Sequence, residues 1–97
     1  MLTKDKILIM LHTYKEKHKE QYGIEQIGLF GSYAKDKATD QSDVDVFISL
    51  KHSNLFLLSR IRIELEELMG IPTDIVQLRE RMNKYLKKRI EQEAISA

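Results

Sequence analysis

Apolar residues recur every three to four positions in the first part of the chain, which is the spacing of an amphipathic helix. Thr3 precedes this pattern as a plausible N-cap and Gly23 follows it as a stop signal, so the pattern predicts a helix over residues 3–21. The predicted inner face of this helix carries Ile7, Leu8, Leu11, Tyr14 and His18.

Two strands are expected next, separated by a short polar segment. Residues 24–30 form an apolar run that leads directly into Gly31 and Ser32, which predicts a buried strand and a tight turn. A brief helix is expected over residues 33–37 and a polar loop over residues 38–42.

Residues 43–49 alternate with a period of two, as a strand does. One face of this strand carries Asp43, Asp45 and Phe47. The opposite face, which is expected to belong to the core, carries Val44, Val46 and Ile48.

The second half of the chain repeats the alternation of helix and strand. Asn54 is expected to cap a long helix that ends at Gly70 and Pro72, a third strand follows over residues 73–78, and a last helix spans residues 83–95. The long helix has an apolar face made of Leu55, Leu58, Ile61, Leu65 and Leu68, and the last helix has one made of Leu86, Ile90 and Ala94.

This order of elements predicts an α/β fold in which a small mixed β-sheet is covered by helices. The helix between the second and third strands is long enough for a right-handed crossover, so these strands should be parallel, either as neighbours or one strand apart. A chain of 97 residues suits one domain, residues 1–97.

Composition narrows the function classes. With 42% hydrophobic and 32% charged residues, no apolar run near the roughly 20 residues of a membrane span and no signal-peptide pattern, a soluble cytoplasmic protein without a membrane partner is expected. The absence of cysteine excludes disulfides, thiolate zinc sites and a cysteine nucleophile.

Net charge argues against direct nucleic-acid binding as the main activity, because it is only +1. Basic residues nevertheless gather near the C-terminus, where they form either a solvated helix face or a contact with an acidic partner or RNA. This basic run consists of Arg79, Arg81, Lys84, Lys87, Lys88 and Arg89.

Three aspartates are the candidates for metal chemistry. Asp43 and Asp45 lie two apart on a strand, so their carboxylates point the same way with Cα atoms roughly 6.6 Å apart. Such a pair favours a hard cation such as Mg²⁺, and Asp74 joins it if the third strand lies beside the second. Three acids can hold two ions, the arrangement that supports in-line displacement at phosphorus.

A candidate anion site precedes these acids. Gly31 lets the backbone turn sharply, so that amide groups at the start of a following helix can face a phosphate, and Ser32 adds a hydroxyl donor. An ordinary turn with Ser32 as N-cap is the alternative. Tyr33, directly after the turn, is a further candidate to flank a nucleotide.

Taken together, these motifs resemble the polymerase-β-like nucleotidyltransferase superfamily, and more narrowly its minimal nucleotidyltransferase (MNT) branch. The resemblance rests on the Gly-Ser turn within residues 31–35, on Ser42-Asp43-Val44-Asp45, and on the later strand acid within residues 72–76, and it covers nearly the whole chain.

The resemblance implies a role for each matching residue. Gly31 and Ser32 would bind the triphosphate of ATP, with Lys35 neutralising a phosphate where many members have arginine. Asp43 and Asp45 would ligate Mg²⁺, and Asp74 would complete the metal site and help to deprotonate the acceptor hydroxyl. Asp36 stands where the family usually has glycine, and aspartate tolerates a positive φ better than most residues do.

The resemblance also implies a function and a partner. The chain would transfer AMP from ATP to a tyrosine hydroxyl of a HEPN-domain RNase toxin, in a complex in which it acts as the antitoxin. Two alternatives remain open: an inactive binding module that neutralises its partner by covering it, and a small-molecule adenylyltransferase of the aminoglycoside-modifying kind.

Overall fold

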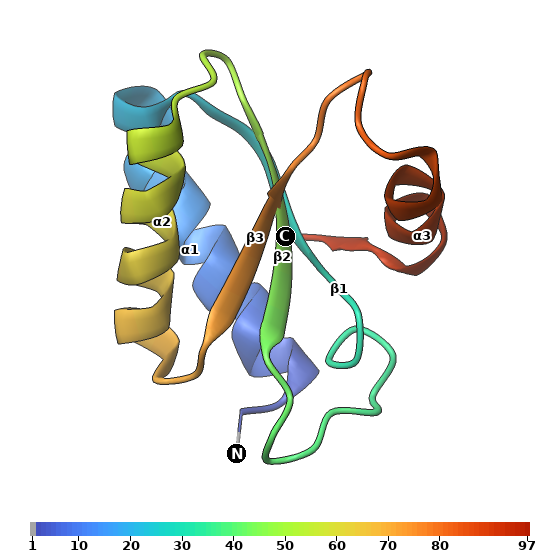
Figure 1. Ribbon diagram of the computed structural model, residues 1–97. Coiled ribbons are helices and arrows are strands. Elements are labelled where there is room, and N and C mark those ends of the chain that lie inside the picture. Colours follow the sequence, from blue (N-terminus) through green and yellow to red (C-terminus); the bar gives the residue numbers. More distant parts are fainter. Residues whose placement is uncertain (1) are drawn as a thin grey trace.

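The computed structural model describes residues 2–97, which form three helices and four strands (Figure 1). In chain order these are α1 (Lys4–Tyr22), β1 (Ile24–Phe30), β2 (Val44–Leu50), α2 (Leu55–Met69), β3 (Thr73–Gln77), α3 (Lys84–Glu93) and β4 (Ile95–Ser96). The predicted α/β class with a small mixed sheet is therefore confirmed.

The sheet has the strand order β3-β2-β1-β4. β1 pairs antiparallel with both β2 and β4, whereas β2 and β3 are parallel, as the crossover through α2 requires. The sequence left open whether β2 and β3 are neighbours, and the structure shows that they are. This pairing places Asp45 directly opposite Asp74.

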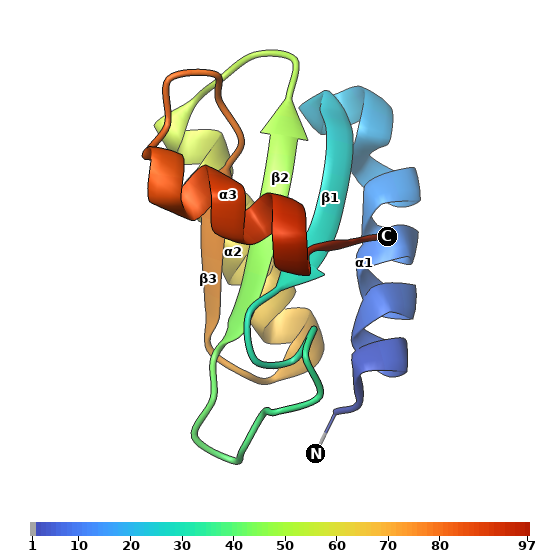
Figure 2. The same ribbon diagram turned by 90° about the vertical axis from the view of Figure 1, so that its right-hand side faces the viewer.

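Helices cover both faces of the sheet. α1 and α2 lie together on one face, and α3 crosses the other face in front of β2 (Figures 1 and 2). The main core lies between the sheet, α1 and α2, and it contains the predicted inner face of β2. A smaller cluster under α3 buries Phe30, Phe47 and Ile90, so both faces of β2 are covered.

The predicted helix boundaries agree with the capping interactions. The Thr3 side chain accepts a hydrogen bond from the Lys6 amide, and Gly23 ends α1 in the left-handed region at φ 66°. The Asn54 side chain caps α2 in the same manner as Thr3 caps α1. No helix within residues 2–97 is both long enough and apolar enough to cross a bilayer.

The brief helix expected over residues 33–37 is not formed. The segment is instead a series of turns, in which the Lys35 amide donates to the Gly31 carbonyl and the Lys37 amide to the Ser32 carbonyl, at 3.2 and 2.9 Å. Asp36 has a φ of 58°, a left-handed conformation that a right-handed helix cannot continue.

The predicted apolar face of α2 is wrong at its two ends. Leu55 and Leu68 are 74% and 50% exposed, and Met69 is buried in place of Leu68. The buried residues Ile61, Leu65 and Met69 follow a spacing of four, so the stripe facing the sheet is narrower than the full set of leucines suggests.

The last helix was predicted to span residues 83–95, and this is wrong at its end, because α3 stops at Glu93. Ala94 is extended, and the chain then adds β4 to β1, with the Ala97 amide donating to the Ile27 carbonyl at 2.9 Å. The free edge of β1 supplies the hydrogen-bond partners for this strand, a tertiary influence that helical periodicity does not reveal.

Candidate functional site

Asp45 and Asp74 form the centre of the candidate site. Their strands are in register, so the two residues are direct neighbours across β2 and β3. Both line one cleft of about 730 Å³ between α2 and α3. Burial raises the pKa of Asp45 above its ordinary value, the nearby Asp74 carboxylate raises it further, and Arg89 opposes the shift.

Asp43 lies just before β2 and is exposed. Its charge also contributes to the raised pKa of Asp45, less than Asp74 does. Within residues 2–97, no three carboxylate or imidazole side chains are arranged to hold a metal ion. The structure therefore brings Asp45 and Asp74 together and leaves Asp43 as a neighbour of this pair.

Gly31 connects the turn to this acidic pair. It is buried with a φ of 77°, and a Cβ atom placed on it would overlap the Asp45 carboxylate. Glycine is required here for two reasons, the left-handed backbone and the close approach of a carboxylate. The turn thus begins in direct contact with the side chain of Asp45.

The turn does not present a helix N-terminus, because no helix follows it. The amides of Lys35 and Lys37 are used within the turn, which removes them from the expected anion site. Ser32 is half-buried, next to Gly31. Tyr33 does not flank this site, because it is 4% exposed and packs in the main core.

Asp36 fits its unusual position. It adopts a left-handed conformation, with a φ of 58°, which aspartate tolerates better than most residues do. Its carboxylate accepts a hydrogen bond from Lys4 Nζ at 2.9 Å, and the side chain is 69% exposed. Its negative charge is therefore paired with α1 at the surface.

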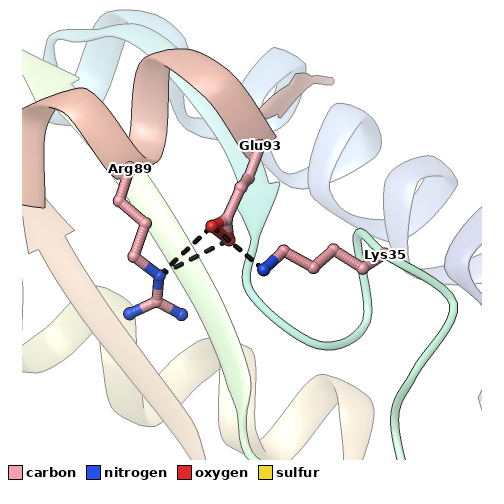
Figure 3. Close-up of polar contacts among 3 residues, drawn as sticks. All are labelled: Lys35, Arg89 and Glu93. Atoms are coloured by element: carbon pink, nitrogen blue, oxygen red, sulfur yellow. Dashed lines mark hydrogen bonds and ion pairs between the residues drawn. The ribbon is translucent and has the colours of Figure 1, made fainter.

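Lys35 reaches across to α3, where it meets a charge cluster that the sequence did not predict (Figure 3). Lys35 Nζ lies 3.1 Å from the Glu93 carboxylate, and Arg89 Nε donates to the same carboxylate at 3.4 Å. The Arg89 guanidinium also lies 5.6 Å from the centroid of the Phe30 ring. Arg89, which the sequence placed in the basic run, therefore belongs to the site.

Only one signal in the sequence could have singled out Arg89 and Glu93. They are four residues apart on a helix, the spacing of an ion pair, but that spacing is common on solvated helix faces. Their approach to Lys35 depends on how α3 crosses the sheet, which is a tertiary property.

The chain is similar to known proteins over most of its length. Residues 11–97 match the family model described as "Nucleotidyltransferase domain". A Methanocaldococcus jannaschii protein, provisionally named protein adenylyltransferase MJ0126, is 35% identical over 98% of both chains. Protein adenylyltransferase MntA of Thermococcus cleftensis is 37% identical over 78% of both chains.

Solved structures agree with the fold. One, provisionally assigned as a minimal nucleotidyltransferase, is 27% identical with a TM-score of 0.71 and covers 91% of this chain and 93% of its own. Another, described as a tri-AMPylated HEPN toxin of Shewanella oneidensis in complex with MNT antitoxin, is 15% identical with a TM-score of 0.68 and covers 93% and 70%. The chain belongs to the nucleotidyltransferase domain family and is a nucleotidyltransferase.

Proposed function

We propose that this nucleotidyltransferase transfers AMP from ATP to a tyrosine hydroxyl of a HEPN-domain toxin and thereby acts as its antitoxin. The proposed reaction depends on Mg²⁺ held by Asp43, Asp45 and Asp74. It breaks the bond between the α- and β-phosphates of ATP and forms a bond from the hydroxyl oxygen to the α-phosphorus, so that pyrophosphate leaves.

The observation that carries the proposal is the pairing of Asp45 with Asp74 beside the Gly31 turn. The Asp74 carboxylate raises the pKa of Asp45, and a hard cation between the two would relieve this repulsion. Carboxylate oxygens are the ligands that Mg²⁺ prefers. Asp43, whose charge also contributes to the raised pKa of Asp45, would be the third ligand. When bound, Mg²⁺ would stabilise the charge that develops on the phosphate oxygens.

The remaining residues receive roles that follow from their chemistry. The Ser32 hydroxyl can donate to a phosphate oxygen, and the Lys35 ammonium can neutralise a phosphate as a point charge. Asp74, exposed at the cleft, can accept the proton of the acceptor hydroxyl as that oxygen attacks.

The choice of a protein acceptor rests on the names of relatives and of a structural neighbour. The relatives above are named as protein adenylyltransferases, and a structural neighbour is described as an AMPylated HEPN toxin in complex with MNT antitoxin.

The direct test is incubation of the protein with ATP, Mg²⁺ and a HEPN-domain toxin, followed by intact mass measurement. The HEPN protein is expected to gain one or more whole adenylyl groups, and peptide mapping should place them on tyrosine. A HEPN protein of unchanged mass would refute the proposal.

A double variant separates catalysis from neutralisation by binding alone. Asp43→Asn with Asp45→Asn should abolish both the mass increase and the protection of RNA from the HEPN protein. The exposed loop variant Asp40→Asn, which removes one negative charge outside the site, should behave like the wild type. Protection that survives the double variant would mean that the chain acts as a binding module.

A further inference from the structure

Arg89 is held over the cleft by two contacts of different kinds. Its guanidinium lies over the Phe30 ring, 5.6 Å from the ring centroid. Its Nε donates to Glu93, a side chain that is only 14% exposed (Figure 3). Phe30 is the residue before Gly31 and the partner of Asp45 across β1 and β2. Arg89 is thus fixed at the junction of the turn and the acidic pair.

The orientation of Arg89 leaves part of its guanidinium available. Both of its hydrogen bonds within residues 2–97 use Nε, so neither η-nitrogen donates to the described protein. Arginine presents its donors in a planar fork that matches phosphate oxygens, and a guanidinium already held by a carboxylate loses little freedom on binding. The side chain lines the same cleft as Asp45 and Asp74.

The acidic and basic side chains at and beside the cleft come from different elements. Asp45 and Asp74 lie on the sheet, while Lys35 on the turn and Arg89 on α3 share the Glu93 carboxylate. A triphosphate with a bound divalent cation would match this arrangement, because the cation would face the carboxylates and the free phosphate oxygens would face the basic side chains. One shared glutamate does not balance two cations, so Lys35 and Arg89 together retain positive charge.

We propose that Arg89 is a substrate-binding residue that contacts the triphosphate of the nucleotide, in addition to Lys35. This inference rests on the proposed function, because it takes ATP to be the substrate. The inference gives α3 a direct role in binding, because α3 would contact the phosphates of the nucleotide rather than its base.

The test measures equilibrium binding by calorimetry, in the presence of Mg²⁺, with ATP and with inorganic tripolyphosphate. Arg89→Ala should lower the affinity for both ligands by a similar factor, roughly 10- to 100-fold for the loss of a charge-assisted contact. Arg89→Lys should fall between the wild type and Arg89→Ala. The matched control is Arg81→Ala, which removes the same charge from an exposed loop position.

Each outcome has one interpretation. Equal affinity of Arg89→Ala and wild type for ATP would overturn the inference and leave the proposed function standing. Weaker binding of ATP by Arg89→Ala with unchanged binding of tripolyphosphate would overturn it as well, because Arg89 would then not contact the phosphates. The same holds if the wild-type protein binds no tripolyphosphate. Wild-type protein that binds no ATP would refute the proposed function itself. Unchanged circular dichroism and thermal midpoint establish that the variants are folded.

Discussion

At the scale of single residues, Gly31 carries two requirements that can be separated experimentally. Gly31 and Gly70 both have a positive φ, 77° and 70°, but only the Cβ position of Gly31 is occupied by another group, the Asp45 carboxylate. Gly70 has no atom within 4 Å of its Cβ position. The pair therefore compares backbone strain alone with strain plus displacement of a site residue.

Gly31→Ala is expected to remove activity and to lower stability, whereas Gly70→Ala should lower stability alone. The left-handed conformation costs a non-glycine residue about 1–2 kcal/mol in either variant, and Gly31→Ala must also move Asp45. Urea unfolding measures the first effect and adenylyl transfer the second. Full activity of Gly31→Ala would show that Asp45 does not need its observed position.

The sequence predicted part of this site at the residue scale. Asp45 and Asp74 were found because strand periodicity and a turn motif are local patterns, and each lies on the element expected for it. Arg89 and Glu93 were missed because their relevance depends on contact with Lys35, more than fifty positions earlier. The apolar periodicity of a helix does not reveal which distant segment the helix will contact.

At the scale of elements, Glu66 ties α2 to the start of β3. Its carboxylate accepts hydrogen bonds from the Thr73 amide and from Arg62, each at 3.0 Å, and Thr73 is buried directly before Asp74. The Thr73 amide lowers the pKa of Glu66 below its ordinary value of 4.5, and Arg62 adds to this shift. The ionised carboxylate therefore stabilises the folded state.

The variant Glu66→Gln is expected to be less stable than the wild type at neutral pH. Because the pKa is lower in the folded state, the contribution of Glu66 is complete above pH 4.5 and is lost as the pH falls below 4.5. The difference in free energy of unfolding should therefore shrink in acid, as measured by urea unfolding across this range. Glu67→Gln, on the exposed neighbour, should show no such difference.

Most elements followed from the sequence because their signals are local. Apolar spacing and caps placed α1, β1 and α2 within about a residue of their observed bounds. β4 was missed because its two residues carry no periodicity of their own, and pairing with β1 alone makes them a strand. The turn over residues 33–37 was mistaken for a helix because a single left-handed residue, Asp36, interrupts it.

At the scale of the whole molecule, the two faces of the sheet are stabilised unequally. The main core buries residues from α1, α2, β1 and β2, whereas the cluster under α3 buries three residues. A segment held by a small cluster can open without global unfolding. α3, which carries Arg89, should therefore be the least stable part of the site.

The same substitution on the two faces tests this inequality. Ile61→Ala in the main core should lower the free energy of unfolding by roughly 2–5 kcal/mol, the usual cost of a buried isoleucine. Ile90→Ala should cost less globally, because α3 can detach first, and should speed hydrogen exchange mainly over residues 84–97. A uniform increase of exchange in Ile90→Ala would show that both faces unfold as one unit.

The ion pair between Lys35 and Glu93 has a consequence for the order of folding. It joins positions 58 residues apart, from 93 minus 35, whereas α1, β1 and β2 follow one another closely along the chain. Contacts between distant positions form late, because the loop between them must first close. The site is therefore expected to assemble in the last step of folding, so that changes in α3 alter the rate of unfolding and leave the rate of refolding nearly constant.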